Sequence, residues 1–217
     1  MDFFQAFSWV NIRFLFDGLM VTIQVAVLSI ILSFIFGGIL GVIRYMKIPV
    51  VSKIVGLIID IIRNLPLLLI IFFTYFALPQ IGIQFSIFGS AVAAMTIFES
   101  AMLSEIIRAG LLSVPPGQFE AGRSTGLSYF QTLYYIVFPQ GIKLMIPPLV
   151  SQFISLIRDT SLAVIISLPE LTHHAKIIYA QDPTAVLPMF FAMTLCYFVI
   201  CYSLSLLANY FEKRLAV

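Results

Sequence analysis

The sequence predicts an all-α integral membrane protein, and two observations support this fold class. Of the 217 residues, 61% are hydrophobic and 10% are charged, whereas a soluble domain has about 45–50% apolar and about 25% charged residues. Apolar runs also recur along the chain at the length of about 20 residues that a membrane helix needs. The formal net charge is only +2, which gives no indication of a nucleic-acid partner.

Five apolar segments are long enough to cross a membrane, and we treat residues 1–217 as a single transmembrane domain. The predicted spans are about 18–43, 54–78, 87–112, 144–167 and 185–209. The first and the last contain no charged residue. The other three contain charges, prolines or both, which are tolerated at membrane depth where neighbouring protein or a water-filled cavity satisfies them. We therefore expect these three spans to line a pathway.

The segment before the first span alternates aromatic and polar residues. Its aromatic side chains are Phe3, Phe4, Phe7, Trp9, Phe14 and Phe16. This pattern predicts an amphipathic helix at the membrane surface, with Trp9 at headgroup depth. Within the first span, Gly37 and Gly41 are four residues apart, a spacing that either lets another helix approach closely or arises by chance.

The basic residues predict the orientation of the chain in the membrane, since cytoplasmic loops carry an excess of Lys and Arg. If the N-terminus is outside, the loop and tail residues that fall inside are Arg44, Lys47, Lys53, Arg123, Lys143, Lys213 and Arg214. Only Arg13 and Lys176 then fall outside. We expect a multi-pass protein with its N-terminus outside and its C-terminus inside.

The long inner loop, about 113–143, has the pattern of two short helices. The Pro-Pro-Gly run at 115–117 ends the preceding span. Residues 118–125 then form one helix that stops at Gly126, which suits a left-handed C-cap. Ser128 suits the N-cap of a second helix, over about 129–137, that ends before Pro139. The loop is therefore predicted to be a helical elbow on the cytoplasmic face.

This loop resembles the EAA loop of ABC importer permeases. That pattern is E-A-A, three residues, G, nine residues, I, any residue, L-P. The matching residues are Glu120, Ala121, Gly122, Gly126, Ile136 and Pro139. Gly122 departs from the second Ala and Phe138 from the Leu. The runs IRNLPLLLIIFF, SEIIRAGLLSVPPGQFEAG and IRDTSLAVII resemble the polar amino-acid permeases of the histidine/glutamine type, and this resemblance covers nearly the whole chain.

The resemblance implies a type I ABC importer fold in the bacterial cell membrane. Two permeases, identical or paired with a sister chain, would form the pathway. Two ABC ATPases would dock on the EAA loops, and an extracellular or periplasmic solute-binding protein would deliver a polar amino acid such as glutamine or glutamate. The chain has no G-x-x-x-x-G-K-[ST] motif. We therefore expect a non-catalytic subunit without a cofactor, whose partner chain binds the ATP.

Arg158 and Asp159 are charges at membrane depth that need partners. Neighbours in sequence point about 100° apart on a helix, so these two are poorly placed to neutralise only each other. A bound amino acid offers its α-carboxylate to the forked guanidinium of Arg158 and its α-ammonium to Asp159. In the alternative interpretation, each pairs with a charge on a neighbouring helix, such as Asp60 or Glu105.

Four further polar residues are candidates to line the substrate pathway. Glu99 and Ser100 lie near the middle of the third span, where Glu99 contacts the ligand or is instead protonated or paired with another helix. Gln152 and Ser155 lie on the turns before Arg158. Gln152 and Ser155 are predicted to line the same cavity as Arg158.

Two charge pairs are expected to be structural. Asp60 and Arg63 are three residues apart, as are Glu105 and Arg108, a spacing that places each pair on one face of a helix. We predict an ion pair within the helix in both cases.

The histidines and cysteines give no indication of a metal or redox centre. His173 and His174 lie in an outer loop beside Lys176, without a cluster of carboxylates, so contact with the docking receptor is the better interpretation. The two cysteines, Cys196 and Cys201, lie in one apolar span without metal-site spacing and are interpreted as packing residues.

Two other classes of function compete with the importer subunit. A secondary transporter would work alone on an ion gradient, but five spans without an inverted repeat argue against it. An intramembrane enzyme would need a metal cluster or a nucleophile–base set, and the sequence shows neither.

Overall fold

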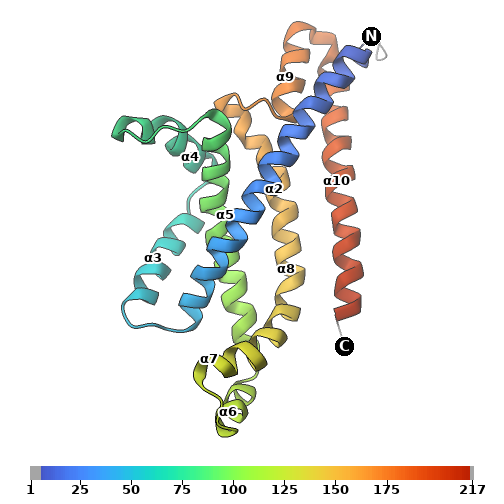
Figure 1. Ribbon diagram of the computed structural model, residues 1–217. Helices are drawn as coiled ribbons and strands as arrows, with labels where there is room; N and C mark the ends of the chain where they lie inside the picture. The colour runs from blue at the N-terminus through green and yellow to red at the C-terminus, as the bar shows by residue number, and fades with distance from the viewer. Residues whose placement is uncertain (1–5, 216–217) are drawn as a thin grey trace.

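The computed structural model describes residues 6–215, and it is helical with no strand in that range (Figure 1). The α-helices are α2 (Trp9–Tyr45), α3 (Val51–Arg63), α4 (Leu67–Phe72), α5 (Ile87–Leu112), α6 (Pro116–Ser124), α7 (Tyr129–Thr132), α8 (Phe138–Asp159), α9 (Leu171–Gln181) and α10 (Val186–Leu215). Helices α2, α5, α8 and α10 run along the bundle, with α6 and α7 at one end and α9 at the other. Four helical stretches in this range are long and apolar enough to cross a membrane, and the bent pair described below is a fifth if it counts as one span.

Helix α2 begins at Trp9, where the Ser8 hydroxyl accepts a hydrogen bond from the Asn11 backbone N–H at 3.4 Å. From Trp9 onward the aromatic N-terminal segment is therefore continuous with the first span and is not a separate surface helix. The hydrophobic run leaves no breaker between the two parts, so one helix of 37 residues forms. Trp9 itself is 77% exposed, as expected for an interfacial anchor, while Phe3 and Phe4 lie outside the described residues.

Helix α2 packs on α5 through a stripe of small residues. A Cβ atom on Gly37 would lie 2.9 Å from the Ser100 carbonyl oxygen, and one on Gly41 would lie 2.7 Å from the Ser104 carbonyl oxygen. These glycines therefore let the two backbones touch, which decides for close helix approach over chance as the reason for their spacing.

The second predicted span is broken in its middle. Helix α3 and the helical stretch Leu67–Ile81, which begins with α4, meet at an angle of 101° around Asn64, Leu65 and Pro66. Pro66 is extended (ψ 131°) and has no N–H to donate, so α3 ends before it and α4 starts anew. After α4 the chain continues through a π-helical turn (Phe73–Ala77) and a 3-10 turn (Leu78–Ile81).

The prolines of the fourth span do not interrupt it. Pro139 lies in the first turn of α8, where its missing N–H is tolerated, and the helix runs on through Pro147 and Pro148. The expectation that the preceding helix ends before Pro139 is therefore wrong. A π-helical turn (Leu133–Val137) carries the chain from α7 directly into α8.

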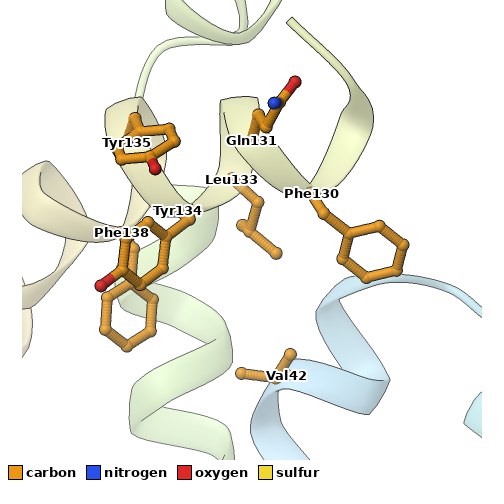
Figure 2. A pocket seen from close by; sticks show the side chains of 7 residues that line it. All are labelled: Val42, Phe130, Gln131, Leu133, Tyr134, Tyr135 and Phe138. Carbon is orange, nitrogen blue, oxygen red and sulfur yellow. The ribbon is translucent and has the colours of Figure 1, made fainter.

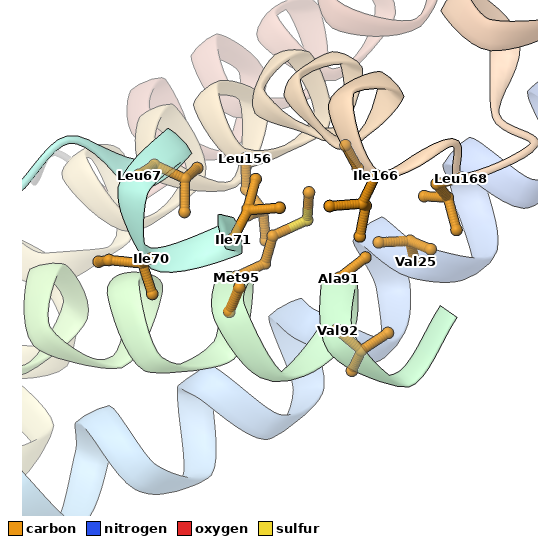
Figure 3. Packing of buried hydrophobic residues seen from close by; sticks show 12 residues of the cluster. Val25, Leu67, Ile70, Ile71, Ala91, Val92, Met95, Leu156, Ile166 and Leu168 are labelled. Carbon is orange, nitrogen blue, oxygen red and sulfur yellow. The ribbon is translucent and has the colours of Figure 1, made fainter. Parts of the chain in front are cut away.

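A hydrophobic core packs several helices together near the N-terminal end of α5 (Figure 3). Its buried residues come from α2, α4, α5, α8 and the 3-10 turn Thr160–Ile166, and they include Val25, Leu67, Ile71, Met95, Leu156 and Ile166. This core seats the α4 half-span against α5, while the opposite faces of the long helices expose apolar side chains, as lipid contact requires.

Candidate functional site

The loop between α5 and α8 forms the predicted elbow. Gly126 has φ +90°, and the Leu127 N–H returns to the Gly122 carbonyl at 3.3 Å, which closes the end of α6. Ser128 caps α7 in a reciprocal box: its hydroxyl accepts from the Gln131 N–H, and the Gln131 side chain accepts from the Ser128 N–H at 2.8 Å. Both predicted caps are confirmed, so the turn between the two helices is fixed from both sides.

Gly122 explains a departure from the EAA pattern. It is buried, and a Cβ atom there would lie 2.6 Å from Ile136 Cδ1 and 2.8 Å from Thr132 Cγ2. An alanine would force these side chains to move, so α6 sits closer to the π-helical turn than an alanine allows. Glu120 and Ala121, on the same helix, are exposed.

An apolar hollow of about 510 Å³ lies beside the elbow (Figure 2). Its lining residues are Val42, Phe130, Gln131, Leu133, Tyr134, Tyr135 and Phe138. Three of them, Phe130, Tyr134 and Tyr135, are between 65% and 68% exposed. The hollow extends from the elbow to the C-terminal part of α2. The elbow therefore has an exposed aromatic surface beside its two capped turns.

An ionic cluster ties three helices together. The Arg44 guanidinium on α2 contacts the Glu105 carboxylate on α5 at 2.5 Å and lies 4.0 Å from Asp60 on α3. Glu105 also pairs with Arg108, as predicted. The predicted Asp60–Arg63 pair is wrong, because no such pair occurs within residues 6–215 and Asp60 faces Arg44 across the helix interface.

The ionic cluster also bears on the alternative interpretation of Arg158 and Asp159, in which they pair with Asp60 or Glu105. Glu105 is engaged by Arg44 and Arg108, and neither Arg158 nor Asp159 forms a salt bridge within the described range. The two charges at 158 and 159 therefore lie apart from the ionic cluster.

Arg158 and Asp159 face different sides of α8. Arg158 is exposed and lines a hollow of about 390 Å³ together with Ser161, Thr172, Phe190, Met193, Thr194 and Tyr197. Its guanidinium is 3.4 Å from the Ser155 hydroxyl. Asp159 is half-buried and lies within electrostatic range of Glu99 on α5. The adjacent charges thus belong to two environments, as the 100° offset requires.

Glu99 is completely buried between α5 and α8. Its Oε2 accepts a hydrogen bond from Gln152 Nε2 at 3.1 Å, so the structure brings these two predicted pathway residues together. Among the described side chains and backbone, the other oxygen, Oε1, has no partner, and neither has the buried hydroxyl of Ser100. This is a half-satisfied carboxyl group in the middle of a membrane span.

Comparison with known proteins decides the family. Residues 33–217 match the family described as binding-protein-dependent transport system inner membrane component. The chain belongs to this family. It is a multi-pass membrane protein and a transport subunit, and the family works in general with an ATPase, a second permease and a binding protein.

Individual relatives and structures agree with this assignment. The permease is 58% identical over 216 residues, 99% of both chains, to the probable glutamine ABC transporter permease protein GlnP of Bacillus subtilis (strain 168). It is 40% identical to the L-cystine transport system permease protein TcyB of the same organism, over 85% of this chain and 81% of that one. A crystal structure of an amino acid ABC transporter with histidines matches with a TM-score of 0.90 at 29% identity, over 99% of both chains.

The α9 end of the permease holds a polar network that the sequence did not predict. Glu170 is fully buried and caps α9 by accepting hydrogen bonds from the Thr172 and His173 backbone N–H groups at 2.8 and 2.7 Å. The Tyr197 hydroxyl on α10 donates to the same carboxyl group at 3.3 Å. Burial raises the pKa of Glu170 to about 7, although the backbone hydrogen bonds act in the opposite direction.

The same end of the permease fastens α9 to α2. The Thr22 hydroxyl accepts from the Leu171 N–H at 3.2 Å. The His174 ring stacks on Phe14 with centroids 3.8 Å apart, and its Nδ1 lies 2.5 Å from the Phe14 carbonyl oxygen. His174 is therefore a buried packing residue. Burial also lowers the pKa of the neighbouring His173. The only sequence signal for this α9 network is an acidic residue directly before a helix.

Proposed function

We propose that this permease is the membrane subunit of an ATP-driven importer of a polar amino acid, with glutamine as the first candidate. The observation that carries the proposal is the double-capped elbow, which gives a separate ATPase a rigid surface to push on. The substrate class rests on the relatives, since one is named for glutamine and another for L-cystine. The permease itself binds no ATP and performs no chemistry.

The elbow residues are proposed to transmit the ATPase motion. Exposed Glu120 and Ala121 contact the ATPase, Gly122 holds α6 against the π-helical turn, and Gly126 allows the sharp bend. Ile136 packs against Gly122, and Pro139 lies in the first turn of α8, which follows the π-helical turn. Closure of two ATPases would move two such elbows together and switch the pathway from inward-open to outward-open.

The substrate is proposed to bind at the C-terminal end of α8, where Arg158 and Asp159 are the last two residues. Arg158 takes the α-carboxylate, with Ser155 beside it, and Asp159 takes the α-ammonium. Glu99, Ser100 and Gln152 meet the side chain of the ligand. A solute-binding protein delivers the amino acid at the outer end, beside His173.

Transport by the reconstituted complex tests the proposal. Liposomes that contain the permease, its ATPase and its receptor should accumulate labelled glutamine only with ATP. Uptake without the ATPase would instead indicate a secondary transporter. Gly126→Val should abolish uptake and ATPase copurification, because a β-branched residue is strained at φ +90°. Gly117→Ala is the matched control, since a Cβ atom there would contact no described atom beyond its chain neighbours and its own helix backbone.

Two charge-removing variants test the substrate contacts. Arg158→Met and Asp159→Asn should each weaken uptake roughly 30-fold to several-thousand-fold, because a lost charged hydrogen bond costs about 2–5 kcal/mol. Assembly with the ATPase should remain normal. Poor assembly of both variants would contradict the ligand contacts and make the charges structural.

The proposed orientation has the N-terminus outside, and cysteine labelling tests it. In a background that lacks Cys196 and Cys201, cysteines at Gly82 and Gly126 should react from opposite sides of the membrane. Reaction of both with an impermeant external reagent would overturn the orientation.

A further inference from the structure

Glu99 stands out among the buried polar groups of the spans because half of its hydrogen-bonding capacity is unused. The side chain is 0% exposed, Oε2 is held by Gln152, and Oε1 has no partner in the described part of the chain. The hydroxyls of Thr96 and Ser100, on the same helix, are buried there without partners as well. An unsatisfied polar group in a low-dielectric interior is costly, so packing alone does not account for it.

The ionisable side chains placed near Glu99 are acidic, and no described cation pairs with it. Asp159 lies within electrostatic range, and among the described residues the side chain that donates to Glu99 is the neutral amide of Gln152. Arg158 lines the hollow beside α10 on another face of α8, while Arg44 and Arg108 are engaged by Glu105. No guanidinium or ammonium among the side chains described, residues 6–210, forms a salt bridge with Glu99.

We propose that Glu99 selects substrates with a terminal side-chain amide over those with a terminal carboxylate. This inference rests on the proposed import function and specifies its substrate class. An amide NH₂ group donates two hydrogens and is neutral, so Glu99 Oε1 and the carbonyl oxygen of Gln152 accept from it. Gln152 is the positioning residue, because its own NH₂ group holds the Glu99 carboxyl in place.

A carboxylate side chain is rejected for two reasons. It has no hydrogen to donate, so Oε1 and the ligand would both remain unpaired acceptors. It also places a further negative charge beside Glu99 and Asp159, where the low dielectric strengthens the repulsion. Discrimination therefore comes from a repulsive element as well as from an attractive one.

Direct binding to the permease–ATPase complex tests the selector, because the receptor makes its own choice of substrate. The purified complex in nanodiscs is incubated with tritiated glutamine and competed with unlabelled glutamate. Wild type should prefer glutamine, and Glu99→Gln should lower this preference on the order of tenfold, mainly by admitting glutamate. Glu99→Asp keeps the charge and should keep the preference at weaker affinity. Ser104→Ala, a buried position whose hydroxyl bonds to its own helix, is the matched control and should leave the ratio unchanged.

The outcomes separate this inference from the function on which it rests. If the wild-type complex with ATPase and receptor transports neither amino acid, the proposed function fails. If it transports glutamine but Glu99→Gln leaves the ratio unchanged, or weakens both ligands equally, only the selector is overturned. If Glu99→Gln does not assemble, the preference of Glu99→Asp for glutamine over glutamate is the deciding measurement. Loss of this preference in Glu99→Asp, which retains the carboxyl group, overturns the selector.

Discussion

Two glutamates of this permease, Glu170 and Glu99, are both 0% exposed but differ in their hydrogen-bond partners. Glu170 accepts hydrogen bonds from two backbone N–H groups and from the Tyr197 hydroxyl, so it satisfies donors that the start of α9 would otherwise leave buried. Glu99 accepts from the side chain of Gln152, a residue that needs no carboxyl partner to keep α8 helical. The difference indicates that a buried carboxyl group supports the fold when it completes backbone hydrogen bonding, and is free to serve transport when it does not.

Removal of Glu170 should have the largest effect. Glu170→Ala leaves two buried N–H groups and the Tyr197 hydroxyl without their acceptor, and each unsatisfied group costs about 1–3 kcal/mol. We expect a loss of about 3–5 kcal/mol in the free energy of unfolding. Thermal unfolding of the detergent-purified complex measures it. A normal melting temperature would contradict the structural role of Glu170.

The contact between α2 and α9 should give the next largest effect. Thr22→Val keeps the side-chain shape but leaves the Leu171 N–H without an acceptor, so we expect a loss of about 1–3 kcal/mol. Ser113→Ala is the control, because its exposed hydroxyl bonds to its own helix. Equal melting temperatures for the two variants would show that the α9 network adds little to stability.

The pH dependence of stability should report the same network. The pKa of Glu170 is raised to about 7 by burial, so its contribution is fully present at low pH and is lost as the pH rises through 7. Between pH 6 and pH 8 this loss amounts to about 1.4 kcal/mol. The lowered pKa of His173 acts in the opposite direction at the acidic end of this range. Thermal unfolding of wild type and of Glu170→Gln across this pH range separates the contribution of the Glu170 carboxyl group. Parallel pH profiles of the melting temperature for the two proteins would contradict the prediction.

The smallest effect on stability should come from Glu99→Gln. The amide keeps the shape and replaces a half-satisfied carboxyl, so we expect a change within about 0.5 kcal/mol of wild type. The same thermal unfolding assay measures it. A loss above about 2 kcal/mol would place Glu99 with Glu170 among the structural residues and remove the contrast.

Local sequence rules predict the features that depend on neighbouring residues. Gly126 and Ser128 are predictable as caps because a glycine tolerates the left-handed backbone after a helix and a serine hydroxyl accepts from the first free N–H groups of the next one. The break in the second span follows from Pro66 in the same way. The Asp60–Arg63 prediction is wrong because Arg44, from another helix, reaches Asp60 instead.

The α9 network lies beyond such rules. Glutamate is not a preferred N-cap residue, and the partners of Glu170 include Tyr197, which is 27 residues away. The Leu171 N–H finds its acceptor 149 residues earlier, at Thr22. Only the packing of α9 between α2 and α10 brings these groups together, and no periodicity in the sequence carries that information.

The glycine contact between α2 and α5 has a consequence for motion. Because Gly37 and Gly41 lie against carbonyl oxygens of α5, the two helices cannot slide along each other without a backbone clash. Any rearrangement must therefore turn them as one rigid body. Helix α2 has 37 residues and is about 55 Å long, so a rotation of about 10° around its midpoint moves each end by about 5 Å. A small tilt at the Arg44 end therefore moves the N-terminal part of α2 in the opposite direction, where Phe14 stacks on His174 of α9.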